Sequence, residues 1–208
     1  MNRSHFLNDR LIYIPDFITQ SEENSLIDIL ENRITERQWR YDGGYKHQFI
    51  VISGGQLTKA GKLIQSSTPD HINSIYTRIQ DYTSVLPNYS ELYVIQPGQG
   101  HSGSVKATTA TLTLSTHLVV QTELANTPIL LEPRSLLIAV DNGPPNVIPG
   151  AVDRVTSPPA SLLNAEHLTK DKYKRFAISG GQLPRSEGYI LTMYDIKSIT
   201  KSFINVLK

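Results

Sequence analysis

Residues 129–140 constrain the fold more than any other part of this sequence. They read Ile-Leu-Leu-Glu-Pro-Arg-Ser-Leu-Leu-Ile-Ala-Val, with an apolar run on each side of Glu132-Pro133-Arg134-Ser135. Runs that are apolar at nearly every position are typical of strands covered on both faces. Pro133 fixes φ near about −65°, as a tight turn requires. The stretch therefore predicts a buried antiparallel hairpin, and such a hairpin needs further strands around it.

Length and charge predict one domain and exclude several classes of protein. With 208 residues, 39% of them hydrophobic, the chain can bury one substantial core. A formal charge of +1 indicates no general attraction to phosphate or anionic lipid, and without cysteine there are no disulfides or thiolate sites. No apolar run reaches the roughly 18 residues that span a membrane, and the N-terminus does not read as a signal peptide. We expect a soluble protein of the cytoplasm or nucleus.

Helical patterns and short strands precede the central stretch. Residues 11–14 predict a strand that ends at Pro15. Thr19 and Glu22 fit a capping box, in which each side chain satisfies a backbone amide at a helix start. A helix is therefore predicted over about residues 21–33. Pro69 suits the first turn of a second surface helix that ends near residue 85.

From Glu91 onwards the apolar period changes from 3.6 to 2, which indicates strands. Residues 92–95 predict one strand, and residues 108–120 alternate. Thr111, Thr113 and His117 fall on one face, with leucines on the other, which is typical of an antiparallel sheet with one face in water. Residues 189–196 predict a closing strand and residues 198–207 a C-terminal helix.

Residues 141–183 form an irregular, proline-rich and basic insertion. Irregular connections longer than about 15 residues are usually functional or disordered. Within the insertion Lys170, Lys172, Lys174 and Arg175 cluster around a tyrosine. A solvated surface is the ordinary interpretation of so small a cluster, and a contact with phosphate or with a partner is the alternative.

Four stretches, in this order along the chain, resemble the AlkB-like iron(II)/2-oxoglutarate dioxygenases, and most of all the branch called AlkB homologue six in animals. They are residues 13–18 (Tyr-Ile-Pro-Asp-Phe-Ile), 97–100 (Pro-Gly-Gln-Gly), 108–117, and 130–138 (Leu-Leu-Glu-Pro-Arg-Ser-Leu-Leu-Ile). The resemblance implies one mainly β, α+β domain over residues 1–208. Its fold would be a double-stranded β-helix, a cupin-like jelly roll with flanking N-terminal helices and a C-terminal helix.

The positions that carry the chemistry of these enzymes differ in this chain. Active members hold iron with two histidines and one carboxylate and grip 2-oxoglutarate with arginine. After Pro-Gly-Gln-Gly the chain reads His101-Ser102-Gly103, with glycine in place of the ligating aspartate. The distal histidine corresponds to Pro149. Gly188 and Tyr194 stand where the family has two arginines.

These departures predict a catalytically inactive protein, with no catalytic, cofactor-binding or metal-binding residues and no cofactor. A remnant pocket would contain His101, Gly103, Pro149, Gly188 and Tyr194. Function lies in sites rather than folds, so we expect this protein to act by binding, as a subunit of a protein assembly or associated with nucleic acid, and not with a membrane.

Two alternatives stay open. The chain could be an active iron(II)/2-oxoglutarate-dependent nucleic acid demethylase with a non-standard metal site, for which Asp141 and Asp153, on either side of the irregular segment, are the first carboxylates to test. His101 and His117 are the histidines near the expected mouth, and without a carboxylate they make at best a weak site. It could also be a nucleic-acid-binding remnant that uses the basic residues at 170–175, with an affinity that falls steeply with salt.

Overall fold

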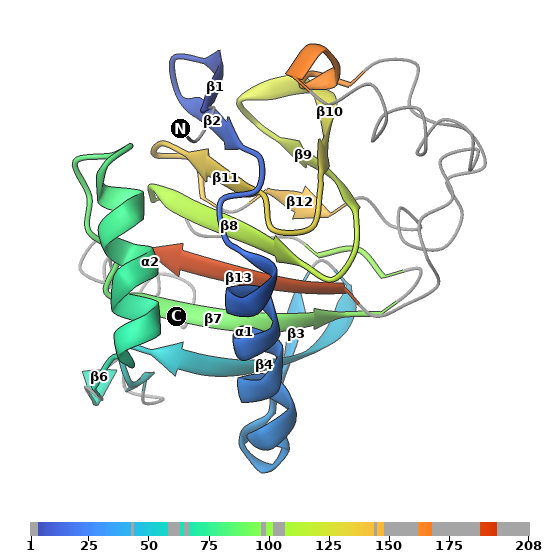
Figure 1. Cartoon of the computed structure of the whole chain (residues 1–208). Helices are drawn as coiled ribbons and strands as arrows, with labels where there is room; N and C mark the ends of the chain where they lie inside the picture. Colours follow the sequence, from blue (N-terminus) through green and yellow to red (C-terminus); the bar gives the residue numbers. More distant parts are fainter. Residues whose placement is uncertain are drawn as a thin grey trace.

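The computed structural model describes residues 4–42, 44–57, 63–64, 67–96, 99–101, 107–143, 145–147, 162–167 and 188–194. Its main feature is an eight-stranded antiparallel sheet in the order β1-β2-β11-β8-β13-β7-β4-β3 (Figure 1). In that order the strands are β1 (His5–Asn8), β2 (Leu11–Ile14), β11 (Leu136–Ala139), β8 (Thr109–Leu114), β13 (Gly188–Tyr194), β7 (Tyr89–Ile95), β4 (Tyr45–Ser53) and β3 (Gln38–Asp42).

A smaller sheet and two helices lie on opposite faces of the large sheet. The smaller sheet has the order β10 (Ala125–Leu131), β9 (Leu118–Thr122) and β12 (Asn146–Val147), and a separate strand pair is formed by β5 (Gln56–Leu57) and β6 (Leu63–Ile64). Helices α1 (Gln20–Asn32) and α2 (Asp70–Gln80) lie in front of the large sheet in Figure 1. Two short 3-10 turns, η1 (Ile34–Glu36) and η2 (Ala165–His167), complete the described elements.

Alternate residues of the large sheet enter two different cores. On β11, Leu136 and Ile138 pack with the helices, whereas Leu137 and Ala139 pack with the smaller sheet. Two antiparallel sheets that enclose a core between them form the double-stranded β-helix, so the predicted fold class is confirmed.

The predicted hairpin at residues 130–138 is wrong, although both of its strands are present and buried. β10 pairs with β9 in the smaller sheet, whereas β11 pairs with β2 and β8 in the large sheet. The connecting turn bonds to β8, because Arg134 N–H donates to the Thr113 carbonyl (2.7 Å) and Thr113 N–H donates to the Ser135 carbonyl (3.0 Å). Apolar runs show that both strands are covered on two faces. They do not show which strands pair with them.

The predicted water-exposed face of residues 108–120 is also wrong. All six residues of β8 are buried, including Thr111 and Thr113. The smaller sheet covers the threonine face, and the helices cover the other. A turn at Ser115 and Thr116 separates β8 from β9.

Local signals predicted where both helices begin, whereas α2 ends at Gln80 and not near residue 85 as expected. The capping box of Thr19 and Glu22 is formed at the start of α1, and Pro69 directly precedes α2. The predicted C-terminal helix and the basic cluster at 170–175 lie outside the described residues. In the described part of the 141–183 insertion, β12 extends the smaller sheet and residues 162–167 pack beside β10. No helix among the described residues is both long and apolar enough to cross a bilayer.

Candidate functional site

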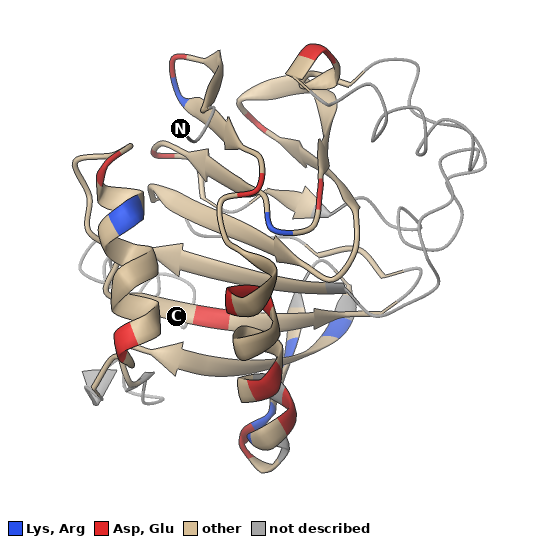
Figure 2. Cartoon of the chain, in the orientation of Figure 1, with Lys and Arg blue, Asp and Glu red and all other residues tan. Residues whose placement is uncertain are grey.

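The space between the two sheets contains an acidic residue. On β7, Leu92 and Val94 pack against the helix side, so the odd-numbered residues of the strand face the smaller sheet. Glu91 is one of these and is 2% exposed. It is the red segment in the middle of β7 in Figure 2. A carboxylate so deeply buried requires partners.

Arg40 provides the main partner. It lies on β3, two strands away from β7. Its Nη1 donates to Oε2 of Glu91 at 2.7 Å and its Nη2 donates to Oε1 at 2.8 Å. The guanidinium also lies 4.2 Å from the centre of the Phe49 ring. This bidentate geometry is the one by which arginine binds carboxylates most strongly.

Three tyrosines complete the coordination of the Glu91 carboxylate. The hydroxyl of Tyr89 donates to Oε1 at 2.8 Å, and those of Tyr93 and Tyr194 donate to Oε2 at 2.6 and 3.0 Å. Arg40 also donates to the Tyr93 hydroxyl. The carboxylate thus accepts two hydrogen bonds from Arg40 and one from each tyrosine. We call these five residues the Glu91 network.

Electrostatics keep this network charged. Burial by itself would raise the pKa of Glu91, but the charge of Arg40 and the hydrogen bonds from Arg40, Tyr93 and Tyr89 outweigh it and hold that pKa below its usual value. Burial, and then the negative charge of Glu91, raise the pKa of Tyr194. Glu91 is therefore an anion at neutral pH, and Tyr89 and Tyr194, whose pKa values are both raised, stay protonated as donors.

Two histidines lie beside the network. The rings of His47 and His101 meet edge to face with centres 5.1 Å apart, and the His101 ring lies 4.6 Å from that of Tyr93. Burial, followed by the nearby His47 and Arg40, lowers the pKa of His101 to about 3. His101 is therefore a neutral imidazole at physiological pH. Its Nδ1 has no hydrogen-bond partner among the described residues.

A group of threonines continues the polar lining on the other side of Glu91. Thr192 of β13 lies opposite Glu91 on one side and opposite Thr111 of β8 on the other. Thr109 and Thr113 precede and follow Thr111 on the same face of β8. All four are at most 2% exposed, and their hydroxyls have no hydrogen-bond partner in the part of the chain that the structure describes. Buried hydroxyls without partners are costly.

The structure places some of the predicted pocket residues here. His101 and Tyr194 belong to this lining, and Gly188 begins β13 opposite Ile95. Gly103 and Pro149 lie outside the described residues, as does Asp153. Asp141 is exposed, and its carboxylate accepts a hydrogen bond from Thr108 (3.2 Å). His117 is half-buried and directly precedes β9.

Sequence reasoning missed Arg40, Glu91 and His47. The available signal was the alternation Tyr89-Glu91-Tyr93, which places an acid between two aromatic residues on one face of a strand. A lone acid in such a position requires a buried cation or a cluster of donors. The identity of that cation depended on the strand order, which brings Arg40 close from 51 positions away.

An iron(II)/2-oxoglutarate centre needs three iron ligands and an arginine that can bind the cosubstrate carboxylate. Among the described residues, no group of three or more histidine, aspartate or glutamate side chains could hold a metal ion. Among the described residues of the large sheet, Arg40 is the one arginine or lysine that faces the smaller sheet. Its Nη1 and Nη2 are already bound by Glu91. The described residues therefore do not fit iron and 2-oxoglutarate.

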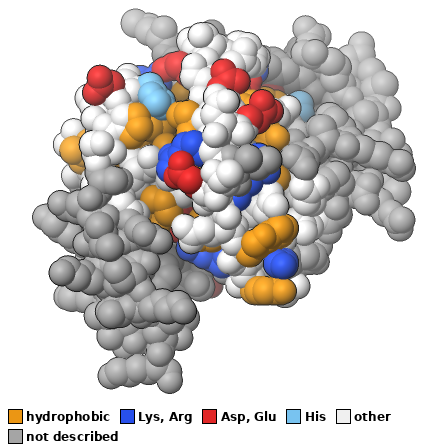
Figure 3. All heavy atoms as spheres, turned by 90° about the horizontal axis from the view of Figure 1, so that it is seen from below, with side chains coloured by type: hydrophobic (Ala, Val, Ile, Leu, Met, Phe, Trp, Pro, Cys, Tyr) orange, Lys and Arg blue, Asp and Glu red, His pale blue; other side chains and the backbone are white. Residues whose placement is uncertain are grey.

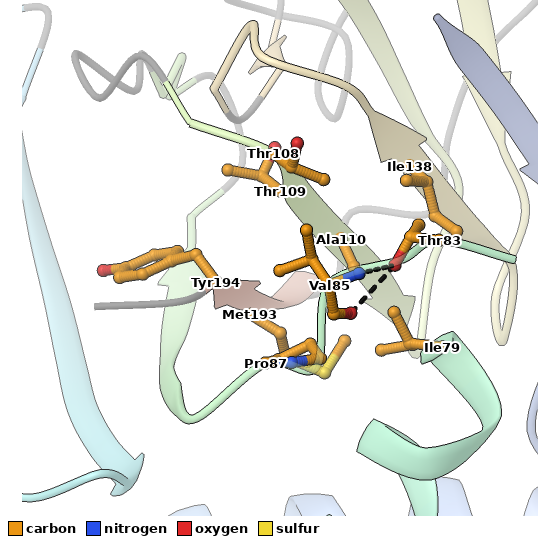
Figure 4. A pocket seen from close by; sticks show the side chains of 10 residues that line it. All are labelled: Ile79, Thr83, Val85, Pro87, Thr108, Thr109, Ala110, Ile138, Met193 and Tyr194. Atoms are coloured by element: carbon orange, nitrogen blue, oxygen red, sulfur yellow. Dashed lines mark hydrogen bonds between the residues drawn. The ribbon is translucent and has the colours of Figure 1, made fainter. Parts of the chain in front are cut away.

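A separate cleft lies at one end of the large sheet, between β8, β13 and the segment after α2 (Figure 4). It is shallow: the empty space of about 200 Å³ at this place includes open solvent. Its lining is mainly apolar and includes Ile79, Val85 and Met193, and Thr83 bonds to the backbone of Val85 beside it. Apart from the rim residue Tyr194, the cleft contains no part of the Glu91 network.

Known proteins resemble this chain in fold. No protein-family model and no curated protein sequence matches it. A Pseudomonas putida prolyl-4-hydroxylase matches with a TM-score of 0.50 at 11% identity, over 89% of this chain and 92% of that one. A viral collagen prolyl hydroxylase from Paramecium Bursaria Chlorella virus-1 matches with a TM-score of 0.49 at 9% identity, over 90% and 96% of the two chains. A 2OG-Fe(II) oxygenase family oxidoreductase from Burkholderia pseudomallei matches with a TM-score of 0.48 at 9% identity, over 88% and 84%.

The alignment with the Pseudomonas enzyme spans nearly all of both chains. This chain therefore has the jelly-roll fold of the 2-oxoglutarate/iron(II) oxygenases. At 11% identity the similarity is one of fold, and a fold of this kind supports many functions.

Proposed function

We propose that this chain is a non-catalytic protein with a 2-oxoglutarate dioxygenase fold, and that it acts by binding, as a subunit of a protein assembly or associated with nucleic acid. Within that proposal it is an AlkB-like pseudoenzyme that uses neither iron(II) nor 2-oxoglutarate. One observation carries the proposal: the carboxylate of Glu91 occupies the Arg40 fork and the three tyrosine hydroxyls between the sheets.

Glu91 and the carboxylate of a cosubstrate would compete for a single cation, Arg40. A cosubstrate carboxylate would have to displace Glu91 from Arg40 and leave the Glu91 anion buried without its partner. Breaking a buried ion pair in this way costs about 3 to 5 kcal/mol, which corresponds to roughly two to four orders of magnitude in affinity. An internal carboxylate fixed by five hydrogen bonds is therefore an efficient competitor of 2-oxoglutarate.

Calorimetric titration of the protein with manganese(II), alone and then with 2-oxoglutarate, tests this proposal. A functional site would bind its ligand with a Kd of about 1 μM, or about −8 kcal/mol, and we expect no binding heat at such ligand concentrations. We also expect no succinate after incubation of the protein with iron(II), 2-oxoglutarate and alkylated oligonucleotides. Binding at that level, or the production of succinate, would refute the pseudoenzyme.

The alternative, an active dioxygenase with a non-standard metal site, gains some support from the contact between His47 and His101. Two adjacent imidazoles are suitable ligands for divalent iron. In this case His47→Phe should abolish metal binding, and Asp153→Ala should abolish activity. Asp141→Ala serves as the control, because Asp141 is exposed and bonded to Thr108.

A further inference from the structure

The two edges of the large sheet differ. At one edge, the pairing of β1 with β2 is interrupted by a register shift between Phe6 and Asn8. At the other edge, β3 pairs with β4 in unbroken register from Gln38 to Asp42. Among the described residues no strand pairs with the free side of β3. Bulges and prolines are common devices that prevent edge strands from pairing with another chain, and β3 has neither.

β3 also exposes two aromatic side chains on one face. Trp39 is 56% exposed and Tyr41 is 71% exposed, and both are among the four large hydrophobic residues that are exposed in the described chain. The Lys46 ammonium, from the neighbouring strand, lies 4.3 Å from the Trp39 ring centre and 5.9 Å from that of Tyr41. Figure 3 shows hydrophobic side chains on either side of a basic one on the face seen from below.

The charged residue at the centre of β3 does not block this edge. Arg40 lies between Trp39 and Tyr41, and its guanidinium extends over Phe49 towards Glu91, away from the free side of the strand. An inward-pointing charge would protect an edge if it had no partner. Here Glu91 neutralises it.

We propose that this edge binds a second copy of the same chain, with β3 of each copy paired antiparallel about a two-fold axis. Pairing with Arg40 opposite the partner's Arg40 places Trp39 opposite the partner's Tyr41, and Tyr41 opposite the partner's Trp39. A strand that meets its own copy antiparallel is self-complementary, as a two-fold interface requires. The eight-stranded sheets of the two copies then form one continuous sheet.

Side-chain chemistry supports this occupant. Aromatic residues directly opposite each other are among the most favourable cross-strand pairs. This register forms two such pairs from rings that the monomer exposes to water. Each Lys46 keeps its contact with the aromatic cluster, since cation and ring attract each other. The formal charge of +1 per chain offers little repulsion between copies. The pairing does not depend on the proposed function.

Trp39 is the only tryptophan of the chain, so its fluorescence reports on this edge alone. Sedimentation equilibrium and fluorescence emission should be measured together on the full-length protein between about 1 and 100 μM, the range of a weak specific interface. We expect a monomer–dimer equilibrium in this range. The Trp39 emission should shift to shorter wavelength in parallel with the dimer fraction, because dimerisation removes the ring from water.

Two substitutions at the edge and one control complete the test. Tyr41→Lys places like charges beside Lys46 and should weaken dimerisation at least about tenfold, and the milder Tyr41→Thr should weaken it while retaining β propensity. Phe6→Lys changes the exposed aromatic residue of the opposite edge and should leave the dimer unchanged.

Circular dichroism verifies the fold of each variant. A monomer at about 100 μM overturns the proposal and leaves this edge to a strand of another protein. The proposal is also overturned if a dimer forms without a shift in Trp39 emission, or if Tyr41→Lys dimerises as strongly as the wild type.

Discussion

The guanidinium of Arg40 on β3 crosses the intervening strand β4 and binds both carboxylate oxygens of Glu91 on β7, at 2.7 and 2.8 Å. The pair thereby joins three neighbouring strands of the large sheet on the face that encloses the smaller sheet. Arg40 and the tyrosines form a carboxylate-binding site that the Glu91 side chain of the same protein occupies.

Glu91→Ala should leave this carboxylate-binding site empty. The loss of one partner from a buried pair should reduce the free energy of unfolding by about 3 to 5 kcal/mol. We expect acetate to bind in the vacated place and raise the melting temperature of the variant, because a ligand that binds only the folded state stabilises it. Glu91→Gln is the control, since its amide fills the same space. Equal effects of acetate on the variant, the control and the wild type, at matched ionic strength, would show that no such site opens.

Local sequence signals predicted what local interactions determine. The capping box depends on Thr19 and Glu22, three positions apart, and it forms as expected. The strand character of residues 129–131 and 136–139 is also evident from composition. Their pairing depends on which distant strands lie on each side, and the sequence contains no local record of this. A tight turn between two apolar runs suits a crossover between sheets as well as a hairpin.

The candidate site was less predictable than the fold. The resemblance pointed to His101 and Tyr194, and both lie in the lining. It did not point to Glu91 or Arg40, which lie beside them. Glu91 has its main partner 51 positions earlier in the chain, and the threonine face of β8 appeared water-exposed because alternation alone does not reveal a second sheet above it.

Stability should fall as the solution is acidified from neutral pH. The pKa of His101 is about 3 in the folded chain, owing to burial and to the nearby His47 and Arg40, against about 6.5 when unfolded. Between these values the unfolded chain binds a proton that the folded chain does not. Stability is therefore complete above about pH 6.5 and is lost by up to about 1.4 kcal/mol per pH unit below it. The lowered pKa of Glu91 adds a further loss below its ordinary value of about 4.3.

Urea unfolding at a series of pH values measures this slope. His101→Phe retains an aromatic ring and removes the titrating group, so its slope should be smaller by about one proton between pH 6.5 and pH 5. Asn24→Ala, at an exposed position of α1, removes no titrating group and should keep the wild-type slope. A wild-type slope in His101→Phe would mean that His101 is not held neutral by its surroundings.

The Thr111 hydroxyl is buried without a partner among the described residues, so it should be dispensable for folding. Thr111→Val should leave stability unchanged or raise it by about 1 kcal/mol, because removal of an unsatisfied hydroxyl recovers its desolvation cost. Chemical denaturation provides the measurement, with Thr77→Val on the exposed face of α2 as the matched control. Destabilisation of Thr111→Val by more than about 1 kcal/mol would indicate that water or a ligand binds this row of threonines.

Asn164 fixes residues 162–167 to the outer edge of the smaller sheet. Its Nδ2 donates to the Leu130 carbonyl at 2.7 Å, and the Leu130 N–H donates to its Oδ1 at 3.2 Å, so a fully buried side chain pairs with β10 as a neighbouring strand would. Asn164→Ala leaves both backbone groups without partners, and each buried unsatisfied group costs about 1 to 3 kcal/mol. We therefore expect a loss of about 2 to 5 kcal/mol in unfolding free energy, and faster amide hydrogen exchange at Leu130. Asn24→Ala, which removes an exposed hydrogen bond from α1, should change neither quantity appreciably. Unchanged exchange at Leu130 in Asn164→Ala would mean that β10 does not need this segment to protect its edge.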